Sequence, residues 1–419
     1  MYKTLNLLII VLVISGCVES KSPIVKLRQV DSKKICTNCQ SPNIHKVGSD
    51  KLLITYIQVK DDKNDLLVLR TFDDGKLSIP LTIANGDNWF VNWADIPSIV
   101  SLDKSGNNLM THWLQMSAEG TYDYDIRCAI SKDGGSSWDS SFVLHDDNIA
   151  AEHGFVSMTS TPQGAFATWL DGRQTKTKDV SIKVNENNDH NDDHGHGTNM
   201  PMTIRSAWFD TTGNKLNDIE IDNKVCDCCQ TDVVYTSSGP VVAYRDRSDL
   251  EVRDISIARF IDKKWQHQLV HKDNWTIAGC PVNGPSIAYQ DGLLAVAWYT
   301  QMNDIPKIFL AISKDDGGSF DKPILIDEGK VMGRVDVVID ENKNIIVTWM
   351  ESNDELAQVN TRILTNQFHL QEKQKLLDSQ NQRKIGFPII ELLDDQIIIA
   401  RTQTQNDSLA VYLEIFDYL

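Results

Sequence analysis

The chain has 419 residues, a formal net charge of −17 and 41% hydrophobic residues. This composition is that of a globular protein long enough for a large core, arranged as two or three domains or as one closed repeat fold. The acidic balance argues against a nucleic-acid partner, which requires a basic surface, and gives an anionic ligand no long-range attraction.

The amino terminus has the features of an export signal. Lys3 supplies a positive charge, and the apolar run over residues 5–14 is too short to span a bilayer comfortably. Ile14-Ser15-Gly16-Cys17 follows and resembles the lipobox of bacterial lipoproteins, in which the cysteine becomes the first mature residue and carries lipid. An uncleaved membrane anchor is the alternative.

The lipobox resemblance implies a division of the chain and a location. It implies a signal peptide over residues 1–16, lipidation at Cys17, a tether over residues 17–22 and a folded domain over residues 23–419. The membrane is then a partner through the amino-terminal lipid. The implied location is the bacterial cell envelope, and the outer membrane is favoured because no Asp follows Cys17.

One unit of short strands recurs along the rest of the chain. Its second strand is the easiest to align because it is apolar and most copies end in an aromatic residue. The copies are roughly 50 to 75 residues apart, near the range for propeller blades, and no stretch has a helical period. They occupy residues 52–56, 109–113, 165–169, 241–244, 294–298, 345–349 and, less clearly, 397–400.

The first strands of the units repeat as well, over residues 41–44, 96–100, 154–158, 231–234, 284–287, 334–337 and 387–390. The last unit ends after a third strand at residues 410–415, and residues 24–30 form a spare strand near the amino terminus. Pairing the two would close the ring and remove two sheet edges. We therefore expect an all-β propeller with seven four-stranded blades; six blades is the alternative.

Two turns between third and fourth strands share the pattern S-x-D-x-G-x-x-aromatic. An Asp closes such a turn by accepting hydrogen bonds from nearby N–H groups, and the aromatic residue inserts into the core. The pattern resembles the Asp box, or BNR repeat, of sialidase-like β-propellers, which implies that these residues are structural. The copies comprise Ser131, Asp133, Gly135 and Trp138, and Ser313, Asp315, Gly317 and Phe320.

Functional residues of a propeller are expected on the face where first strands begin and second strands end. The resemblance to sialidase-like propellers implies three arginines that clamp the carboxylate of the substrate, a Tyr nucleophile activated by a Glu, and an Asp that acts as general acid. Asp95 stands where that family has the first arginine, which departs from the pattern. The remaining candidates near this face are Arg173, Arg245, Arg334, Arg401, Tyr299 and Glu351; each arginine has a salt bridge as its structural alternative.

The cysteines have two competing interpretations. An exported chain meets an oxidising compartment, so Cys36 and Cys39 could bridge each other, and Cys280 could reach the cluster of Cys226, Cys228 and Cys229. Thiolates also suit copper or zinc, so that group is alternatively a metal site or a redox site.

An insertion over residues 185–202 lengthens the third unit. It carries His190, His194, His196, Met200 and Met202, which could bind a divalent or cuprous ion. A solvated loop without a ligand is the alternative.

Three functions follow as hypotheses. The first is a non-catalytic propeller that binds a glycan or a protein on its top central face. The second is a glycoside hydrolase of the exo-α-sialidase type. The third is a periplasmic copper, zinc or redox factor that uses the cysteine cluster and the His/Met loop.

Overall fold

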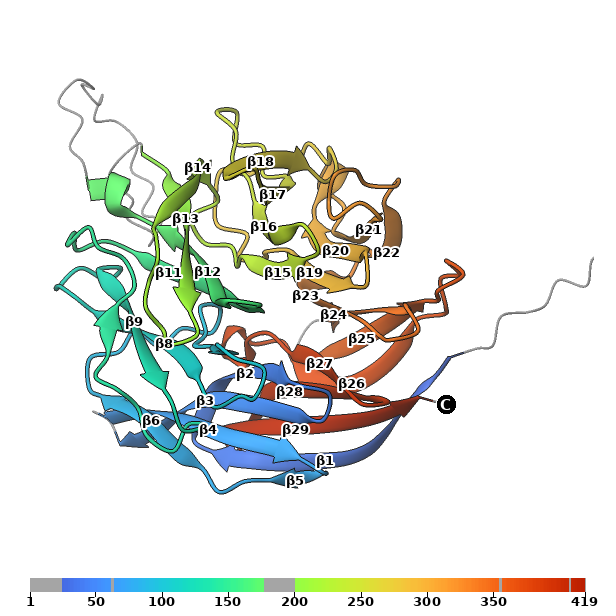
Figure 1. Cartoon of the computed structure of the whole chain (residues 1–419). Coiled ribbons are helices and arrows are strands. Elements are labelled where there is room, and N and C mark those ends of the chain that lie inside the picture. The colour runs from blue at the N-terminus through green and yellow to red at the C-terminus, as the bar shows by residue number, and fades with distance from the viewer. Residues whose placement is uncertain (1–24, 62–63, 177–199, 354–355, 407, 419) are drawn as a thin grey trace, which may run out of the picture.

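A computed structural model describes residues 25–61, 64–176, 200–353, 356–406 and 408–418. Within these residues, seven antiparallel sheets form a ring around a central axis (Figure 1). The fold is a seven-bladed β-propeller, which confirms the all-β prediction and excludes the six-blade alternative. No helix in the described part of the chain is long and apolar enough to cross a membrane.

Each blade runs from an inner first strand at the axis to an outer strand at the rim. The inner strands are β2 (Cys39–Val47), β7 (Ile99–Ser101), β11 (His153–Thr161), β15 (Asp232–Thr236), β19 (Ser286–Gln290), β23 (Val331–Ile339) and β27 (Ile389–Leu393). The second strands are β3 (Lys51–Asp61), β8 (Leu109–Met116), β12 (Gly164–Asp171), β16 (Gly239–Arg245), β20 (Leu293–Thr300), β24 (Ile345–Asn353) and β28 (Gln396–Gln405).

The third strands are β4 (Asn64–Asp73), β9 (Tyr124–Ser131), β13 (Met202–Asp210), β17 (Ile255–Ile261), β21 (Lys307–Ser313), β25 (Leu356–Leu364) and β29 (Ser408–Tyr418). The outer strands are β5 (Lys76–Leu77) and β6 (Leu81–Gly86) in the first blade, then β10 (Phe142–Val143), β14 (Ile219–Val225), β18 (Lys264–Leu269), β22 (Ile324–Glu328), β26 (Gln374–Gln380) and β1 (Leu27–Thr37). Three 3₁₀ turns are η1 (Arg173–Lys176), η2 (Met302–Asp304) and η3 (Arg383–Ile385).

The core is divided among the contacts between blades. The described residues form seven hydrophobic clusters, and each lies between two neighbouring blades. Three second strands contain a buried Trp whose indole N–H donates to an Asp: Trp169 to Asp171 at 3.0 Å, Trp298 to Asp273 at 2.7 Å and Trp349 to Asp327 at 3.1 Å. Along each strand, alternate side chains point to opposite faces of the sheet, so every blade packs against both of its neighbours.

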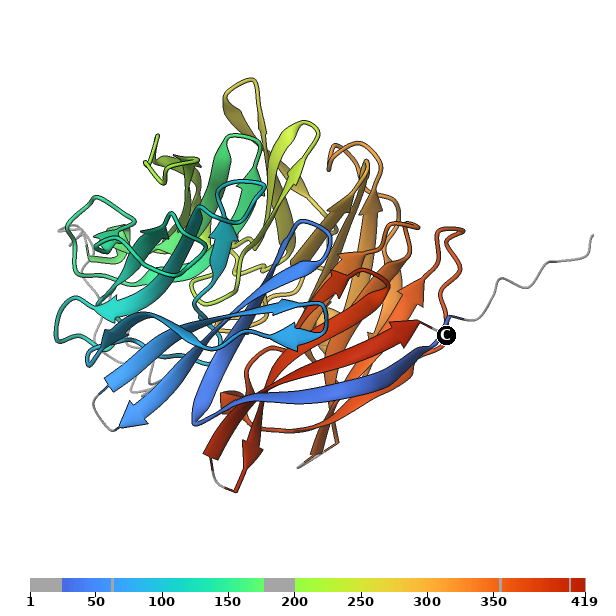
Figure 2. The same ribbon diagram turned by 60° about the horizontal axis from the view of Figure 1, so that its bottom comes forward.

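The ring closes through a blade that joins both ends of the chain. Strand β1 pairs antiparallel with β29, from Leu27 opposite Tyr418 to Thr37 opposite Ala410. Figure 2 shows this blue amino-terminal strand beside the red carboxy-terminal strands. The predicted closure is confirmed, although the closing strand starts later and runs longer than residues 24–30.

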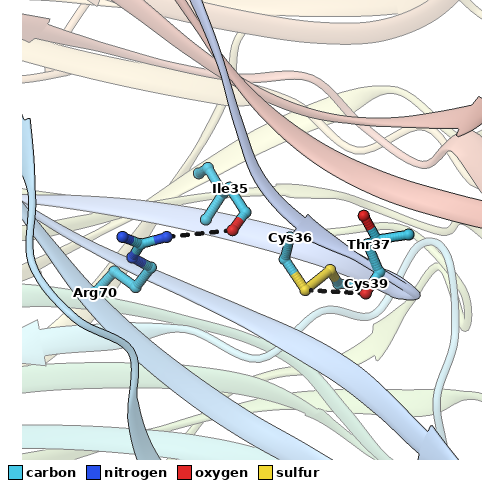
Figure 3. Close-up of a disulfide and its surroundings, with 5 residues drawn as sticks. All are labelled: Ile35, Cys36, Thr37, Cys39 and Arg70. Carbon is cyan, nitrogen blue, oxygen red and sulfur yellow. Dashed lines mark hydrogen bonds between the residues drawn. A yellow bond between two sulfur atoms is a disulfide. The ribbon is translucent and has the colours of Figure 1, made fainter.

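A disulfide links the last blade to the first. It joins Cys36, near the end of β1, to Cys39, at the start of β2, as Figure 3 shows. In the same view the Arg70 guanidinium donates to the carbonyl of Ile35 at 3.2 Å. The predicted bridge between these two cysteines is therefore present, and it fixes the passage from the outer strand of one blade to the inner strand of the next.

The two S-x-D-x-G-x-x-aromatic turns adopt the same hydrogen-bond pattern. In the first copy, Asp133 accepts from the Ser137 amide at 2.8 Å, and the Gly135 amide donates to the Ser131 hydroxyl at 2.9 Å. The second copy repeats both bonds at 2.9 Å. Trp138 then packs against the cluster between the first and second blades, and Phe320 against that between the fourth and fifth.

The alternation of strand direction separates two faces of the ring. Loops before the first strands and after the second strands share one face, which we call the top face. The two S-x-D-x-G turns connect third to fourth strands, so they lie on the opposite, bottom face. The top face is therefore where the predicted functional residues converge.

Candidate functional site

The inner strands surround a central cavity of about 440 Å³. Residues from all seven blades line it, including four carboxyl side chains: Asp95, Asp232, Asp336 and Glu391. Burial raises the pKa of Asp95, Asp232 and Glu391 to about 7 and that of Asp336 to about 6. The cavity thus holds carboxyl groups that are partly protonated near neutral pH.

Two of these carboxyl groups join neighbouring blades. Asp232 in β15 accepts from the Ile287 amide of β19 at 2.8 Å. Asp336 in β23 accepts from the Ile390 amide of β27, also at 2.8 Å. The Ser286 hydroxyl lies between both, 3.2 Å from Asp232 and 2.8 Å from Asp336. These carboxyl groups already have protein partners and are best understood as structural.

Asp95 differs from them because its carboxyl group lacks such partners. It lies in the top-face loop before β7 and is 3% exposed, and neither of its oxygens makes a well-aligned hydrogen bond to the described residues. The Phe155 amide and the Tyr124 hydroxyl nearby lower its pKa, but burial outweighs them. A Cβ at Gly154 would lie 2.1 Å from Asp95 Oδ2, so only glycine leaves room for this carboxyl group.

Two further polar side chains stand next to Asp95. The Tyr124 hydroxyl donates to Glu152 Oε1 at 3.1 Å, and the Tyr124 ring stacks on Phe90 with centroids 4.1 Å apart. Burial raises the pKa of Glu152 to about 8, and the charges of Asp95 and Asp227 add to this effect. We call Asp95, Tyr124 and Glu152 the acid–tyrosine group.

Two members of the acid–tyrosine group, Tyr124 and Glu152, were not predicted from the sequence. Tyr124 begins the third strand of the second blade, and Glu152 immediately precedes the first strand of the third blade. Both positions belong to the top face by strand direction alone, so the repeat could have identified them. Asp95 was noticed only as the place where an arginine is missing.

Two aromatic rings lie near the top of the cavity. Trp93 and Phe387 stack with centroids 5.9 Å apart, and both are partly buried. Phe387 lines the central cavity, while Trp93 lines a small adjoining pocket. They come from the loops before the second and last blades, so the polar acid–tyrosine group has an apolar platform on the same face.

Arg334 and Arg245 are buried and bind backbone carbonyls. Arg334 Nη1 donates to the Gly386 carbonyl at 2.7 Å, and its guanidinium lies 5.0 Å from the Trp93 ring centre. Arg245 donates to the carbonyls of Asn283 and Tyr299, each at 2.7 Å through Nη2. Burial lowers the pKa of Arg334 to about 10. Their donors are committed to the protein, which matches the structural alternative rather than a carboxylate clamp.

Arg401 pairs with a buried acid. Its Nη2 lies 2.7 Å from Glu414 Oε1, and Arg401 Nη1 donates to the Asp378 carbonyl at 3.1 Å. Glu351 is likewise engaged, with Lys373 at 3.0 Å and Asn360 at 2.7 Å. No hydrogen bond in the described residues links Glu351 to Tyr299. The structure therefore gives no support to a sialidase clamp or a nucleophile pair built from the predicted residues.

Arg173 belongs to a cluster between the second and third blades. The rings of His145 and His153 stack with centroids 3.6 Å apart, and each hydrogen-bonds one oxygen of Asp147 at 2.9 Å. Arg173 Nε lies 2.7 Å from Asp171 and 3.0 Å from Asp147. Burial alone would raise the pKa of Asp147, but the hydrogen bonds from His145 and His153 outweigh burial, so the pKa lies below its ordinary value. A metal ion here would compete with the guanidinium that already joins the carboxylates.

The remaining cysteine group consists of free thiols. Cys226, Cys228, Cys229 and Cys280 form no disulfide in the structure. Cys226 and Cys229 have their sulfur atoms 3.0 Å apart. Burial raises the pKa of Cys226, but hydrogen bonds from Cys228 and Cys229 and the charge of Arg253 lower it well below its usual value. Hydrogen bonds to the thiols of Cys226, Cys229 and Cys280 raise the pKa of Cys228.

The predicted His/Met site falls largely outside the described residues. His190, His194 and His196 lie outside them, as does Cys17. Met200 is 38% exposed at the end of the insertion. Met202 does not belong to the loop, because it is the first residue of β13 and is buried between the third and fourth blades. The assignment of Met202 as a ligand is therefore corrected.

No protein-family model and no curated protein matches the chain. Among solved structures, it is similar to a protein of unknown function from Dyadobacter fermentans, with a TM-score of 0.53 and 12% identity over 94% of this chain and 99% of that one. The polysaccharide lyase Uly1 also has a TM-score of 0.53, with 9% identity over 90% of each chain.

A sialidase from Trypanosoma rangeli aligns with a TM-score of 0.41 and 11% identity, over 82% of this chain and 56% of that one. The first two likenesses show a shared propeller fold alone. The function must therefore be argued from the residues of this chain.

Proposed function

We propose that this protein is an exported, lipid-anchored propeller that binds a glycan on its top face, where the central cavity opens. The acid–tyrosine group is the observation that carries the proposal. Asp95 lines the cavity without a well-aligned partner, and Tyr124 and Glu152 stand beside it. A buried polar group without a partner is costly, so a ligand that supplies one is stabilised.

The chemistry of the acid–tyrosine group suits sugar hydroxyl groups. A protonated carboxyl group offers one donor together with an acceptor oxygen, which matches a hydroxyl that both donates and accepts. The raised pKa values of Asp95 and Glu152 keep this form populated near neutral pH. The rings of Trp93 and Phe387, over which the Arg334 guanidinium also packs, supply aromatic contacts for the less polar parts of a sugar ring.

The charge of the site favours a neutral glycan. The chain carries a net charge of −17, and Arg245 and Arg334 already donate to backbone carbonyls. Among the described residues that line the cavity, Lys46 beside Glu391 is the one Lys or Arg, so an anionic sugar at Asp95 would meet mainly carboxyl groups. The polysaccharide lyase with the same fold offers an analogy for a polysaccharide ligand on such a propeller.

Binding is better supported than sialidase-type hydrolysis. A tyrosine nucleophile needs a lowered pKa and access to the substrate. Tyr124 is 1% exposed, and burial together with the charges of Glu152 and Asp95 raises its pKa well above the usual value. The group thus has the residue types of that chemistry without the activation that it requires.

The cellular setting is proposed from the sequence. The signal-like residues 1–16 and the lipobox-like Ile14–Cys17 support a lipid anchor at Cys17 in a bacterial envelope, with the outer membrane favoured. We also propose that the turns at Asp133 and Asp315 are Asp boxes, because both have the same sequence spacing and the same hydrogen bonds.

A glycan array probed with the detergent-solubilised full chain tests the proposal. We expect binding to one class of neutral oligosaccharide, weakened at least tenfold by Asp95→Ala and by Glu152→Ala, which remove both the donor and the acceptor. Asp139→Ala is the matched control, because this exposed Asp pairs with Lys132 near the bottom-face turn. Absence of glycan binding, with capture of a protein partner instead, would overturn the proposal in favour of a protein-binding module.

A further inference from the structure

Four cysteine thiols gather on the top face from two different loops. Cys226, Cys228 and Cys229 belong to the loop before β15 in the fourth blade, and Cys280 belongs to the loop before β19 in the fifth blade. The sulfur atoms of the first three lie within 4.8 Å of one another. Cys280 comes close enough to Cys228 from the neighbouring loop to raise the pKa of the Cys228 thiol, but it lies outside the set of three sulfur atoms that are mutually within 4.8 Å.

The loop that carries three of these thiols is held on both sides. The Cys226 amide donates to the Arg245 carbonyl at 3.0 Å. Asp227 accepts from the Met202 amide at 3.0 Å and pairs with Arg247 at 2.8 Å. Gln230 donates to the Ala94 carbonyl at 2.9 Å, which ties the other end of the loop to the second blade. The sulfur positions are therefore set by the surrounding backbone before any ligand arrives.

The spacing of the sulfur atoms fits a single ion. A tetrahedral site with metal–sulfur bonds of about 2.3 Å places its sulfur atoms about 3.8 Å apart, within the 4.8 Å limit that Cys226, Cys228 and Cys229 satisfy. The sulfur atoms of Cys226 and Cys229, which are 3.0 Å apart, must separate slightly to reach this spacing. A sulfur-only donor set selects soft ions, Cu(I) or Zn(II), over Mg²⁺ or Ca²⁺. Cys228 and Cys280 are partly exposed while Cys226 and Cys229 are buried, so an ion has an entry side.

We propose that Cys226, Cys228 and Cys229 bind one thiolate-preferring metal ion, Cu(I) or Zn(II). Cys280, from the loop of the fifth blade, moves toward this ion as the fourth ligand and so joins the two loops. This site does not depend on the proposed glycan function, because the acid–tyrosine group contributes none of its ligands. The rival outcome is a disulfide between Cys226 and Cys229, whose sulfur atoms are already close.

Metal titration of the untagged full chain under anaerobic, reducing conditions tests this proposal. Zn(II) and Cu(I) are added separately in competition with a chromophoric chelator specific for each ion, and the arm that shows tight binding identifies the ion. We expect one ion per chain, with affinity reduced at least 100-fold by Cys226→Ser and by Cys280→Ser. Cys128→Ser is the control, because Cys128 is a buried thiol in β9 outside the group.

Two further measurements keep the outcomes separate. A chain with His190, His194 and His196 all changed to Ala should still bind the ion, and loss of binding in this variant alone would overturn the cysteine assignment. Circular dichroism must show that the Cys280→Ser chain is folded, because Cys280 is partly exposed and its change should leave the fold intact. Absence of both Zn(II) and Cu(I) binding would also overturn the proposal, as would a Cys226–Cys229 disulfide that survives the reducing conditions of the titration.

Discussion

The bottom and top faces of this propeller use the same residue types in opposite ways. On the bottom face, Asp133 and Asp315 accept hydrogen bonds from their own turns, and those bonds lower the pKa of both carboxyl groups. On the top face, Asp95 is buried with few partners and Glu152 stands beside it, and burial raises the pKa of both. Asp95 on the top face thus lacks the hydrogen-bond partners that Asp133 and Asp315 have on the bottom face.

This difference separates structural from functional carboxyl groups. An acid whose oxygens are all occupied by the protein has nothing left to offer a ligand. A buried acid without partners costs stability and is retained where a ligand can compensate. The same criterion assigns the arginines: those at the top face are occupied by the protein, so they stabilise the ring and do not define a ligand site.

The largest expected effect tests whether Arg401 is structural. Arg401→Leu leaves the Glu414 carboxylate, 1% exposed, with the Gln29 amide but without a cationic partner, so the free energy of unfolding should fall by about 3 kcal/mol. The double variant Arg401→Leu/Glu414→Leu should recover much of this loss. Urea denaturation measures both. An Arg401→Leu chain with unchanged stability would mean that this arginine is free for a ligand, and would contradict its assignment as a structural residue.

The next effect concerns the bottom-face turn. Gly135 has a φ of +89°, and an added Cβ would lie 2.3 Å from Leu69, so Gly135→Ala should lower the free energy of unfolding by about 3 kcal/mol. Gly134→Ala is the matched control. A Cβ added at Gly134 would have no atom closer than 3.8 Å, and the equivalent position of the second turn is Asp316. Gly134→Ala should therefore lower the free energy of unfolding by only about 1 kcal/mol. Equal losses in thermal or urea denaturation would contradict the packing account of this turn.

The pH dependence of stability sharpens the contrast between the faces. The pKa of Asp95 is about 7 in the folded chain against its ordinary value of 3.8, so between these values the folded state holds a proton that the unfolded state lacks. The free energy of unfolding should therefore fall as pH rises from 4 to 7, by up to about 1.4 kcal/mol per pH unit from this group.

Asp95→Asn should flatten the slope by that amount, measured by urea denaturation at pH 5 and pH 7. An identical slope in the variant would show that Asp95 is ionised throughout. Asp133 should behave in the opposite way, because its pKa is lowered on folding: its contribution is present above its unfolded pKa and is lost in acid.

The smallest effect concerns the top-face loop that passes from the closing blade to the first blade, away from the acid–tyrosine group. The Cys36–Cys39 disulfide closes a loop of sequence separation 3, so replacing both residues with Ser should cost about 1–2 kcal/mol. Glycan binding by this variant should equal that of the unchanged chain, because the bridge lies where the closing blade meets the first. A large loss of binding would show that ring closure controls the top face.

The architecture was predictable from the sequence because a repeat reveals itself through spacing and alternation. The seven second strands, the closing amino-terminal strand and the face of each loop followed from runs such as residues 294–298 and from strand direction. These features depend on backbone geometry and period-two burial, which are local properties of the chain.

The site was not predictable to the same degree, since it depends on which side chains meet across blades. Nothing in the sequence shows that Arg334 donates to Gly386, or that Tyr124 reaches Glu152, 28 residues away. The four thiols were expected to be neighbours because adjacent blades bring adjacent loops together. The structure groups Cys226, Cys228 and Cys229 and brings Cys280 close to Cys228.

A crystal structure of the chain with the neutral oligosaccharide that binds best on the array tests the central claim most directly. The account predicts sugar density at the top-face end of the cavity, with hydroxyl groups within hydrogen-bond distance of Asp95 and a ring against Trp93 or Phe387. Sugar density on the bottom face, or at the rim away from Asp95, would contradict it.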